Sequence, residues 1–304
     1  MLGTSALMPL PNRGLASAAL TCAGRGILFD CGEGTQVQMR KYGVSPVRID
    51  LIALSHYHGD HVFGLPGLMQ TMFCLDRKEP LYITGPQGMK EILVPILRLA
   101  GKVGYDVCLI EIPKNGLKMN TLNAAWPEGA LLTAYPTFHR VPSQAYTLEL
   151  SRPGAFLPEN AKALDIPVRL WSTLQKGTPV DVNGRTVFPS EVLTAPRKGL
   201  KFCFSGDTGF CRSLIKAAKN ADLLISEATY GDDEQQQMAN ERGHMTFSDA
   251  ARTARDAGAA RLWLTHYSQM VASPEENREN AARYFPNVEC CTDGQTLTLN
   301  FDER

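Results

Sequence analysis

The chain carries six histidines in 304 residues, and three of them lie in one short segment, His56-Tyr-His58-Gly-Asp60-His61. This segment directly follows the apolar run 49–55, which is typical of a buried strand. Imidazole and carboxylate ligands without a thiolate suit zinc or a similar divalent ion. Because the glycine at position 59 permits a sharp change of direction, one loop can present two ligand sets, as a pair of hydrolytic metal ions requires.

Further ligands are expected after other predicted strands. His139 follows the run Leu131–Tyr135, Asp207 follows a strand-like segment that begins at Lys201, and His266 ends another. One histidine after a strand is usually a structural residue, so His139 and His266 are assigned as ligands jointly rather than singly. The alternative is that the first three histidines are surface residues of a loop without a ligand role. It fits poorly with four potential metal ligands within six residues.

The elements that must position these side chains alternate between strands and helices. Apolar runs that end in Gly, Pro or Asp predict strands, and apolar residues spaced by three and four predict helices. Thr246 and Asp249 form a capping-box pattern at the start of one helix. The strands are predicted at 25–30, 49–55, 80–84, 131–135, 201–206, 221–227 and 261–266, and helices at 34–40, 88–100 and from 246. The chain is therefore of mixed α and β class.

Composition excludes several classes of protein. Lys and Arg number 31 and Asp and Glu number 31, so the formal net charge is zero. A protein that coats nucleic acid through charge alone is excluded, and any such partner needs a local basic patch. No apolar run approaches the roughly 18 residues of a membrane span, and the N-terminus lacks a signal sequence, so we expect a cytoplasmic protein without a membrane partner. The eight cysteines show no C-x-x-C spacing and are interpreted as reduced thiols, mostly in the core.

Residues 151–200 interrupt the alternation. Six prolines and seven basic against four acidic residues distinguish this stretch. We interpret residues 1–304 as one domain from which 151–200 is an arm-like excursion, a possible exosite for tRNA. Its basic side chains would contact a polyanion, although they can also form a solvated face, with Trp171 as a core residue. The basic surface is assigned to six of the seven, namely Arg152, Lys162, Arg169, Lys176, Arg197 and Lys198.

The ordered set His56-x-His58-x-Asp60-His61, His139, Asp207 and His266 resembles the metallo-β-lactamase superfamily. Within it, the chain resembles ribonuclease Z, the family of tRNA 3′-end processing endonucleases, over nearly its whole length. The resemblance implies an α+β fold, the four-layer αββα sandwich, with most of the first strand missing ahead of Leu2. The matching segments are Leu2-Gly-Thr-Ser5, Leu28-Phe-Asp-Cys-Gly-Glu-Gly-Thr-Gln36, Phe63-Gly-Leu-Pro-Gly67, Tyr82-Ile-Thr-Gly-Pro-Gln-Gly88, Phe204-Ser-Gly-Asp-Thr-Gly209 and Glu227-Ala-Thr229.

The resemblance also implies a site and a reaction. Two zinc ions, or manganese ions, would be held by one set of His56, His58 and His139 and another of Asp60, His61 and His266, with Asp207 bridging. A hydroxide between the ions would attack the scissile phosphorus, with Asp60 orienting it or acting as its base. His244, supported by Glu227, would protonate the leaving 3′ oxygen; from the sequence alone His244 can also be a surface residue before a helix. The implied enzyme is a homodimer that removes the 3′ trailer of precursor tRNA and leaves a 3′-hydroxyl.

Two segments depart from the family pattern. Ser226 stands where the family usually has His, and Tyr267-Ser-Gln-Met270 stands where it commonly has Ser-x-Arg-Tyr. The departures spare the metal ligands and bear on RNA positioning, because an arginine beside the ions would hold a phosphate oxygen. A related hydrolase of a small phosphodiester or other ester therefore stays an alternative. A second alternative is a protein that binds metal and acts as an RNA-binding or regulatory module without catalysis. Asp60, Glu227 and His244 argue against it, because binding alone needs no pair of residues that transfers protons.

Overall fold

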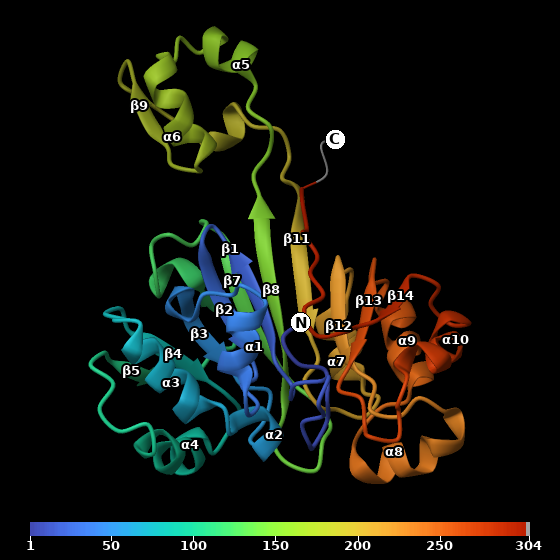
Figure 1. Cartoon of the computed structure of the whole chain (residues 1–304). Helices are drawn as coiled ribbons and strands as arrows, with labels where there is room; N and C mark the ends of the chain where they lie inside the picture. Colours follow the sequence, from blue (N-terminus) through green and yellow to red (C-terminus); the bar gives the residue numbers. More distant parts are fainter. Residues whose placement is uncertain (302–304) are drawn as a thin grey trace. The chain divides into compact units, whose positions relative to one another are not determined.

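A computed structural model describes residues 1–301 of the chain (Figure 1). The chain divides into two compact units. The larger unit, called the body here, comprises Met1–Leu148 and Lys201–Thr298. The smaller unit, called the inserted unit, comprises Glu149–Leu200 with residues 299–301. The inserted unit thus begins two residues before the predicted excursion and ends at the same residue.

Two β-sheets form the centre of the body. The first has the order β1-β2-β3-β4-β5, and β2 to β5 run parallel. The second has the order β14-β13-β12-β11-β8-β7-β6, with β11 to β14 parallel. Their strands are β1 Ala18–Cys22, β2 Arg25–Phe29, β3 Ile49–Ala53, β4 Leu81–Thr84, β5 Val107–Leu109, β6 Leu117–Lys118, β7 Ala130–Pro136, β8 Gln144–Arg152, β11 Arg197–Phe204, β12 Leu223–Glu227, β13 Leu262–Thr265 and β14 Val288–Cys290. All the strands predicted from the sequence are present.

Helices cover the outer face of each sheet, which gives the predicted four-layer αββα sandwich (Figure 1). One apolar cluster joins the first sheet to α1, α3 and α4, and another joins the second sheet to α7, α9 and α10. Between the sheets, the ring of Phe29 lies 5.3 Å from that of Phe204. The body's helices are α1 Thr35–Lys41, α2 Gly59–Val62, α3 Leu65–Cys74, α4 Met89–Arg98, α7 Arg212–Ala218, α8 Gln236–Arg242, α9 Phe247–Ala257 and α10 Arg278–Ala282.

Local sequence signals account for the ends of α9. The Thr246 hydroxyl accepts a hydrogen bond from the Asp249 backbone at 3.2 Å, and the Asp249 carboxylate accepts one from the Thr246 backbone at 3.3 Å. This is the predicted capping box, and Gly258 ends the helix with φ of 65°. One prediction was wrong in part. All eight cysteines are free, but only Cys31, Cys203 and Cys291 are buried, and Cys74, which lies in α3 and not in a strand, is exposed.

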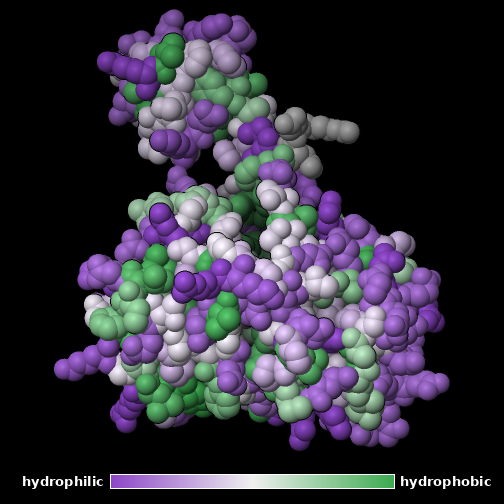
Figure 2. Space-filling model, in the orientation of Figure 1, coloured by the Kyte–Doolittle hydropathy of each residue, from purple (hydrophilic) through white to green (hydrophobic). Residues whose placement is uncertain are grey.

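At the N-terminus, Gly3 and Ser17 pair through an isolated antiparallel bridge ahead of β1. On the surface of the body, apolar side chains gather over α3 and α4 (Figure 2). Leu75, Ile92 and Leu99 are exposed there, Leu99 to 79%. Across residues 1–301, no helix combines the length and the apolar character that crossing a bilayer requires.

The inserted unit has a small core of its own. Its elements are α5 Pro158–Ala163, α6 Trp171–Gln175 and the hairpin of β9 Val180–Val182 with β10 Arg185–Val187. Leu174 and Val192 are fully buried in its aliphatic cluster. The ring of Trp171 lies 5.1 Å from that of Phe156, and its indole donates a hydrogen bond to the Ile166 carbonyl at 3.0 Å. Trp171 therefore stabilises this unit rather than presenting a free aromatic face.

Candidate metal centre

The predicted ligands come from loops that leave the carboxyl ends of strands. His56 follows β3, His139 follows β7, Asp207 follows β11 and His266 directly follows β13. Asp60 and His61 lie on the short helix α2, which begins at Gly59 just after His58. The structure brings all seven predicted side chains together, in groups whose ligand atoms lie within 4.8 Å of one another.

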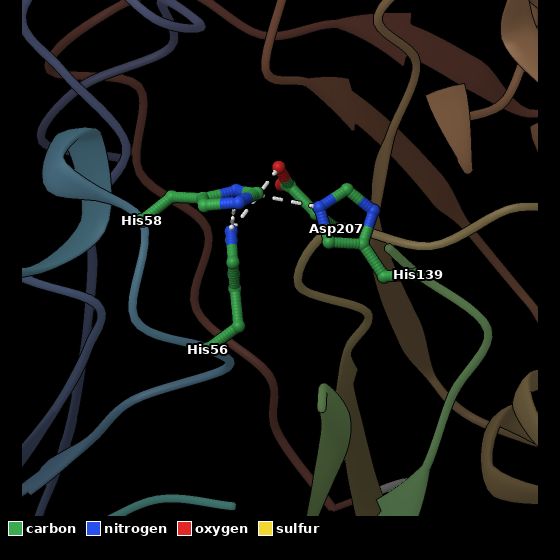
Figure 3. Close-up of side chains that lie close together, drawn as sticks. All are labelled: His56, His58, His139 and Asp207. Atoms are coloured by element: carbon green, nitrogen blue, oxygen red, sulfur yellow. Dashed lines mark hydrogen bonds and ion pairs between the residues drawn. The ribbon is translucent and has the colours of Figure 1, made fainter. Parts of the chain in front are cut away.

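The first group consists of three imidazoles and one carboxylate (Figure 3). His56 Nε2 lies 2.9 Å from His58 Nδ1, and His139 Nε2 lies 3.4 Å from the same atom. His56 Nε2 also lies 3.6 Å from Asp207 Oδ2. Three nitrogens and one oxygen thus converge on one point from three separate loops, which is the usual ligand number of a zinc site.

The second group shares Asp207 with the first. His61 Nε2 lies 3.4 Å from Asp207 Oδ1, and His266 Nε2 lies 3.2 Å from the same oxygen. Asp60 Oδ2 lies 3.5 Å from both of these nitrogens. The two carboxylate oxygens of Asp207 therefore face different groups, Oδ2 the first and Oδ1 the second. This arrangement allows one carboxylate to bridge two cations.

Hydrogen bonds on the outer side fix the tautomers of His56 and His61. The Ser55 hydroxyl donates to Asp30 Oδ2 at 2.8 Å, so His56 Nδ1, 3.0 Å from that hydroxyl, must itself be the donor. His61 Nδ1 donates to Asp30 Oδ2 at 2.8 Å. With both outer nitrogens protonated, the inner nitrogens of the neutral rings carry lone pairs, as metal ligation requires.

The same accounting holds for His139 and His266. His139 Nδ1 donates to the Gly243 carbonyl at 2.8 Å. The Thr229 hydroxyl donates to Glu227 Oε2 at 2.9 Å, so His266 Nδ1, 3.0 Å from that hydroxyl, donates to it. Each of the four imidazoles with an outer partner is therefore oriented by a group that is not itself a predicted ligand.

This donor set fits divalent cations. His61 Nε2 and His266 Nε2 lie 3.2 Å apart, and two neutral imidazoles cannot direct lone pairs at each other over that distance without a proton or cation between them. Burial opposes protonation of His61, yet Asp207, Asp30 and Asp60 raise the pKa of its imidazole well above the ordinary value. Burial likewise disfavours ionised Asp207, but the surrounding imidazoles hold the pKa of its carboxyl well below the ordinary value. The carboxylates thus draw positive charge to this point.

Two side chains of the centre, those of Asp30 and His266, belong to residues with a strained backbone. Asp30 has φ of 57° and His266 has φ of 61°, the left-handed region that residues with a side chain rarely adopt. Each such residue costs about 1–3 kcal/mol and persists where its surroundings determine it. Asp30 is held by Ser55 and His61, and His266 by Thr229. The strained backbone turns these two side chains toward the centre directly after their strands.

A second pair, a buried carboxylate and a partly buried imidazole, lies beside the predicted ligands. Glu227, at the end of β12, is 1% exposed and accepts five hydrogen bonds, from the backbones of Thr208, Thr229 and Met245, the Thr229 hydroxyl and His244 Nδ1. The bond from His244 measures 2.7 Å. Burial of the His244 ring opposes its protonation, but Glu227 and Asp207 raise its pKa to about 9. The charged form of the His244 ring is thus favoured, beside a carboxylate that is itself fixed.

Sequence reasoning missed the outer residues of the centre, above all Asp30 and Thr229. Both come at or just after the end of a predicted strand next to a ligand-bearing strand, and that placement is the signal that could have found them. The structure also adds a third possible metal group, formed by Asp207, His244 and His266. His244 therefore lies close enough to the ligands to act on a group that they hold.

The chain is similar in sequence to curated proteins named ribonuclease Z. It is 38% identical to the one from Lachnoclostridium phytofermentans, with 100% of this chain and 98% of the relative covered. It is 40% identical to the one from Methanothermobacter thermautotrophicus, with 98% and 95% covered. Two family models match parts of the chain: a beta-lactamase superfamily domain over residues 162–267 and the anti-Pycsar protein Apyc1 over residues 1–97.

Solved structures show the same fold. The short form of human tRNase Z superposes with a TM-score of 0.68 at 27% identity and covers 99% of this chain and 98% of its own. The metallo-beta-lactamase fold protein YhfI from Bacillus subtilis has a TM-score of 0.67 at 21% identity, with 97% of this chain and 95% of its own covered. The second likeness concerns the fold alone.

Proposed function

The chain belongs to the ribonuclease Z family, and on that premise we propose that it removes the 3′ trailer of precursor tRNA and leaves a 3′-hydroxyl on the tRNA. It is a hydrolase of the metallo-β-lactamase fold with a metal cofactor. The observation that carries the proposal is the pairing of two candidate ligand groups with a separate, partly buried imidazole, that of His244, which is hydrogen-bonded to Glu227 and can donate a proton. A protein that only bound metal or RNA would have no use for that pair.

The cofactor proposed is two zinc ions, with manganese as the alternative. The first would be held by His56, His58 and His139, the second by Asp60, His61 and His266. Asp207 would be shared by both, because its two oxygens face different groups. When bound, such ions supply Lewis-acid charge that polarises a phosphodiester and acidifies a water molecule.

The protein's own residues then handle the protons. Asp60 lies on the side of the second group, where it would orient the attacking water and take its proton as the oxygen–phosphorus bond forms. As the bond between phosphorus and the 3′ oxygen breaks, His244 would give its proton to that oxygen. Glu227 keeps the His244 ring oriented and favours its charged form. Proton transfer of this kind contributes roughly 10²–10⁴-fold to a rate.

We further propose a cytoplasmic homodimer. Exposed apolar side chains on and beside α4, among them Leu75, Ile92 and Leu99, offer a surface that a second copy would cover (Figure 2). Light scattering during size-exclusion chromatography should give twice the mass of one chain. Leu99→Glu should reduce that mass to one chain if α4 lies in the interface.

The test of the proposed activity uses two substrates, a precursor tRNA with a 3′ trailer and a small chromogenic phosphodiester. We expect cleavage of precursor tRNA at a single position. The tRNA fragment should have the mature length, and periodate should oxidise its terminal ribose, because the hydroxyl groups of that ribose are free. Cleavage of the small diester alone, with metal sites loaded, would favour the alternative of a small-ester hydrolase. Metal analysis of the same sample should give close to two ions per chain; a value that stays near one under saturation would contradict the two-ion centre.

A further inference from the structure

Exposed phenylalanines cluster around the metal centre. Among residues 1–301, the exposed phenylalanines of the body are Phe63, Phe73, Phe138 and Phe210, and all but Phe73 flank a predicted ligand. Phe138 directly precedes His139 and is 60% exposed, and Phe210 follows Asp207 by three residues and is 44% exposed. Exposed rings so close to a polar centre need an explanation that core packing does not give.

Two of these rings belong to loops that lie side by side. The Gly209 backbone donates a hydrogen bond to the Phe138 carbonyl at 2.7 Å, and the Phe138 backbone donates to the Thr208 hydroxyl at 3.2 Å. A methyl group placed on Gly209 would lie 3.0 Å from Cδ1 of the Phe138 ring, so this ring rests against the glycine. The loop that carries His139 and the loop that carries Asp207 thus form one continuous surface.

The two loops repeat a pattern of an aromatic and a basic residue. Phe138-His-Arg140 and Phe210-Cys-Arg212 each place an arginine two residues after the exposed ring. Both arginines are exposed, and within residues 1–301 neither forms an ion pair with a carboxylate. Rings for stacking and cations for phosphates, interleaved on one surface, are what single-stranded nucleic acid binds. Because the chain has no net charge, such local cations are the ones that a polyanion can use.

We infer that Phe138, Arg140, Phe210 and Arg212 form a platform for the unpaired nucleotides next to the scissile phosphate. Bases stack on the two rings while the arginines hold the adjoining phosphates. The platform borders a ligand on each loop, so a phosphate held at the metal centre brings its neighbouring nucleotides over the rings. This inference rests on the proposed function and adds the part of the substrate that the site reads, an unpaired RNA strand rather than a helix.

The test is a double-mutant cycle between ring and base. Phe138→Ala and Phe210→Ala are assayed on precursor tRNA and on precursors that are abasic at the last retained or the first trailer nucleotide. Loss of a stacked base costs roughly 5- to 150-fold in kcat/KM. On intact precursor tRNA, we expect the loss of kcat/KM in each alanine variant to fall within that range. On one of the two abasic substrates, the same variant should show little loss relative to wild type, because the base that its ring would contact is already absent. Phe138→Trp should retain the wild-type value.

Controls separate the platform from structural damage. Phe73→Ala, which removes a ring that is 47% exposed on α3, should leave kcat/KM unchanged. Metal content and melting temperature should equal wild type in all ring variants. For the cations, Arg140→Ala and Arg212→Ala should each lower the slope of log Kd against log salt by about 0.7. Arg261→Ala, an exposed arginine at the opposite end of β13 from His266, should keep the slope.

Three results would overturn the inference while the proposed function stands. The first is that the ring variants cleave precursor tRNA as wild type does. The second is that the loss of kcat/KM from the ring multiplies with the loss from the abasic site at both nucleotides, so that ring and base act independently. The third is a changed oligomeric state with unchanged cleavage, which would make the surface a protein interface. A wild-type enzyme that cleaves the small diester but no precursor tRNA would instead contradict the proposed function, and the inference with it.

Discussion

The metal centre and the inserted unit differ in what holds their side chains in place. In the centre, His56, Asp30 and Glu227 are at most 1% exposed and every outer polar atom of the histidine rings bar that of His58 has a hydrogen-bond partner. In the inserted unit, a few aliphatic side chains around Leu174 and Val192 form the fully or nearly buried core, and charged side chains such as Arg169 and Lys176 are exposed.

A division of the chain between chemistry and RNA binding would account for this contrast. Metal ligands must hold their positions to within fractions of an ångström, so buried partners and strained backbone are acceptable costs there. A surface that contacts phosphates needs only cations on a folded support, because the attraction is long-ranged and insensitive to fine geometry. Changes in the two regions should therefore differ in size and in the substrates that they affect.

The largest effect is expected from removing the shared charge of the centre. Asp207→Asn keeps the side-chain volume but removes the charge that faces both groups. We expect a loss of at least roughly 10³-fold in kcat on every substrate, more than one electrostatic donor usually supplies. Metal content should fall to at most one ion per chain by elemental analysis. Asp256→Asn, an exposed residue of α9, should change neither quantity.

The next effect separates proton transfer from metal binding. His244→Ala should slow cleavage roughly 10²–10⁴-fold, because the leaving oxygen loses its proton donor. Two ions per chain should remain, since the first two ligand groups are complete without His244. The neighbouring Arg242→Ala serves as the control and should retain activity. Loss of an ion from the His244 variant would show that the third group, with Asp207 and His266, is the one that binds metal.

A smaller and substrate-dependent effect is expected from the inserted unit. Ala155 and Thr194 face each other, with the Thr194 backbone donating to the Ala155 carbonyl at 2.9 Å. Replacing residues 156–193 with a short Gly-Ser linker removes the small core without separating these ends. We expect cleavage of precursor tRNA to fall roughly 10- to 100-fold at moderate salt, and hydrolysis of the small diester to stay the same.

Either of two outcomes would break this part of the comparison. Equal losses on both substrates, with the melting temperature retained, would give the inserted unit a structural role in the body. Full activity on precursor tRNA would mean that its basic residues are a solvated face and that RNA is held elsewhere. Raising the salt concentration should narrow the difference between wild type and the replacement, because salt screens the attraction between the basic side chains and RNA phosphates.

Much of the fold was predictable because its signals are local. The capping box at Thr246 and Asp249 marks the start of α9 whatever lies around it. Apolar runs closed by turn residues likewise located β2, β3 and β12. The inserted unit was recognised by its prolines and charges. Its compactness was not, because the seven aliphatic residues of its core, from Ala161 to Val192, are spread too irregularly to form a periodic pattern.

The site was predictable only in part, for a similar reason. The predicted ligands His56, His58, Asp60 and His61 can be recognised in the sequence because all four lie within six residues. Asp30 lies 25 residues before Ser55 and has no such neighbours, so its bond to the His61 ring depends on β2 and β3 pairing in parallel. The aromatic platform was invisible for the same reason, since it arises where two loops about 70 residues apart are joined by hydrogen bonds.

The smallest effect tests whether the outer partners of the centre matter as much as their burial suggests. The Thr229 hydroxyl accepts from His266 Nδ1 and donates to Glu227, and it lies 3.2 Å from His244 Nδ1. Thr229→Val keeps the shape and leaves the His266 N–H without an acceptor, so the ring can turn away from the second group. We expect metal affinity there to fall about 10-fold, the lower end for loss of a second-sphere partner. Competition with a chromogenic chelator measures it.

Two further variants make the result of the Thr229 experiment specific. Thr229→Ser restores the hydroxyl and should restore the affinity, although it opens a small void. Thr147→Val removes a hydroxyl that is equally buried but has no hydrogen-bond partner within residues 1–301, so metal affinity should stay the same and the free energy of unfolding should not decrease. If Thr229→Val bound metal as wild type does, the strained backbone of His266, with φ of 61°, would be enough to hold its ring. The buried hydrogen-bond partners would then not be what distinguishes the centre from the inserted unit.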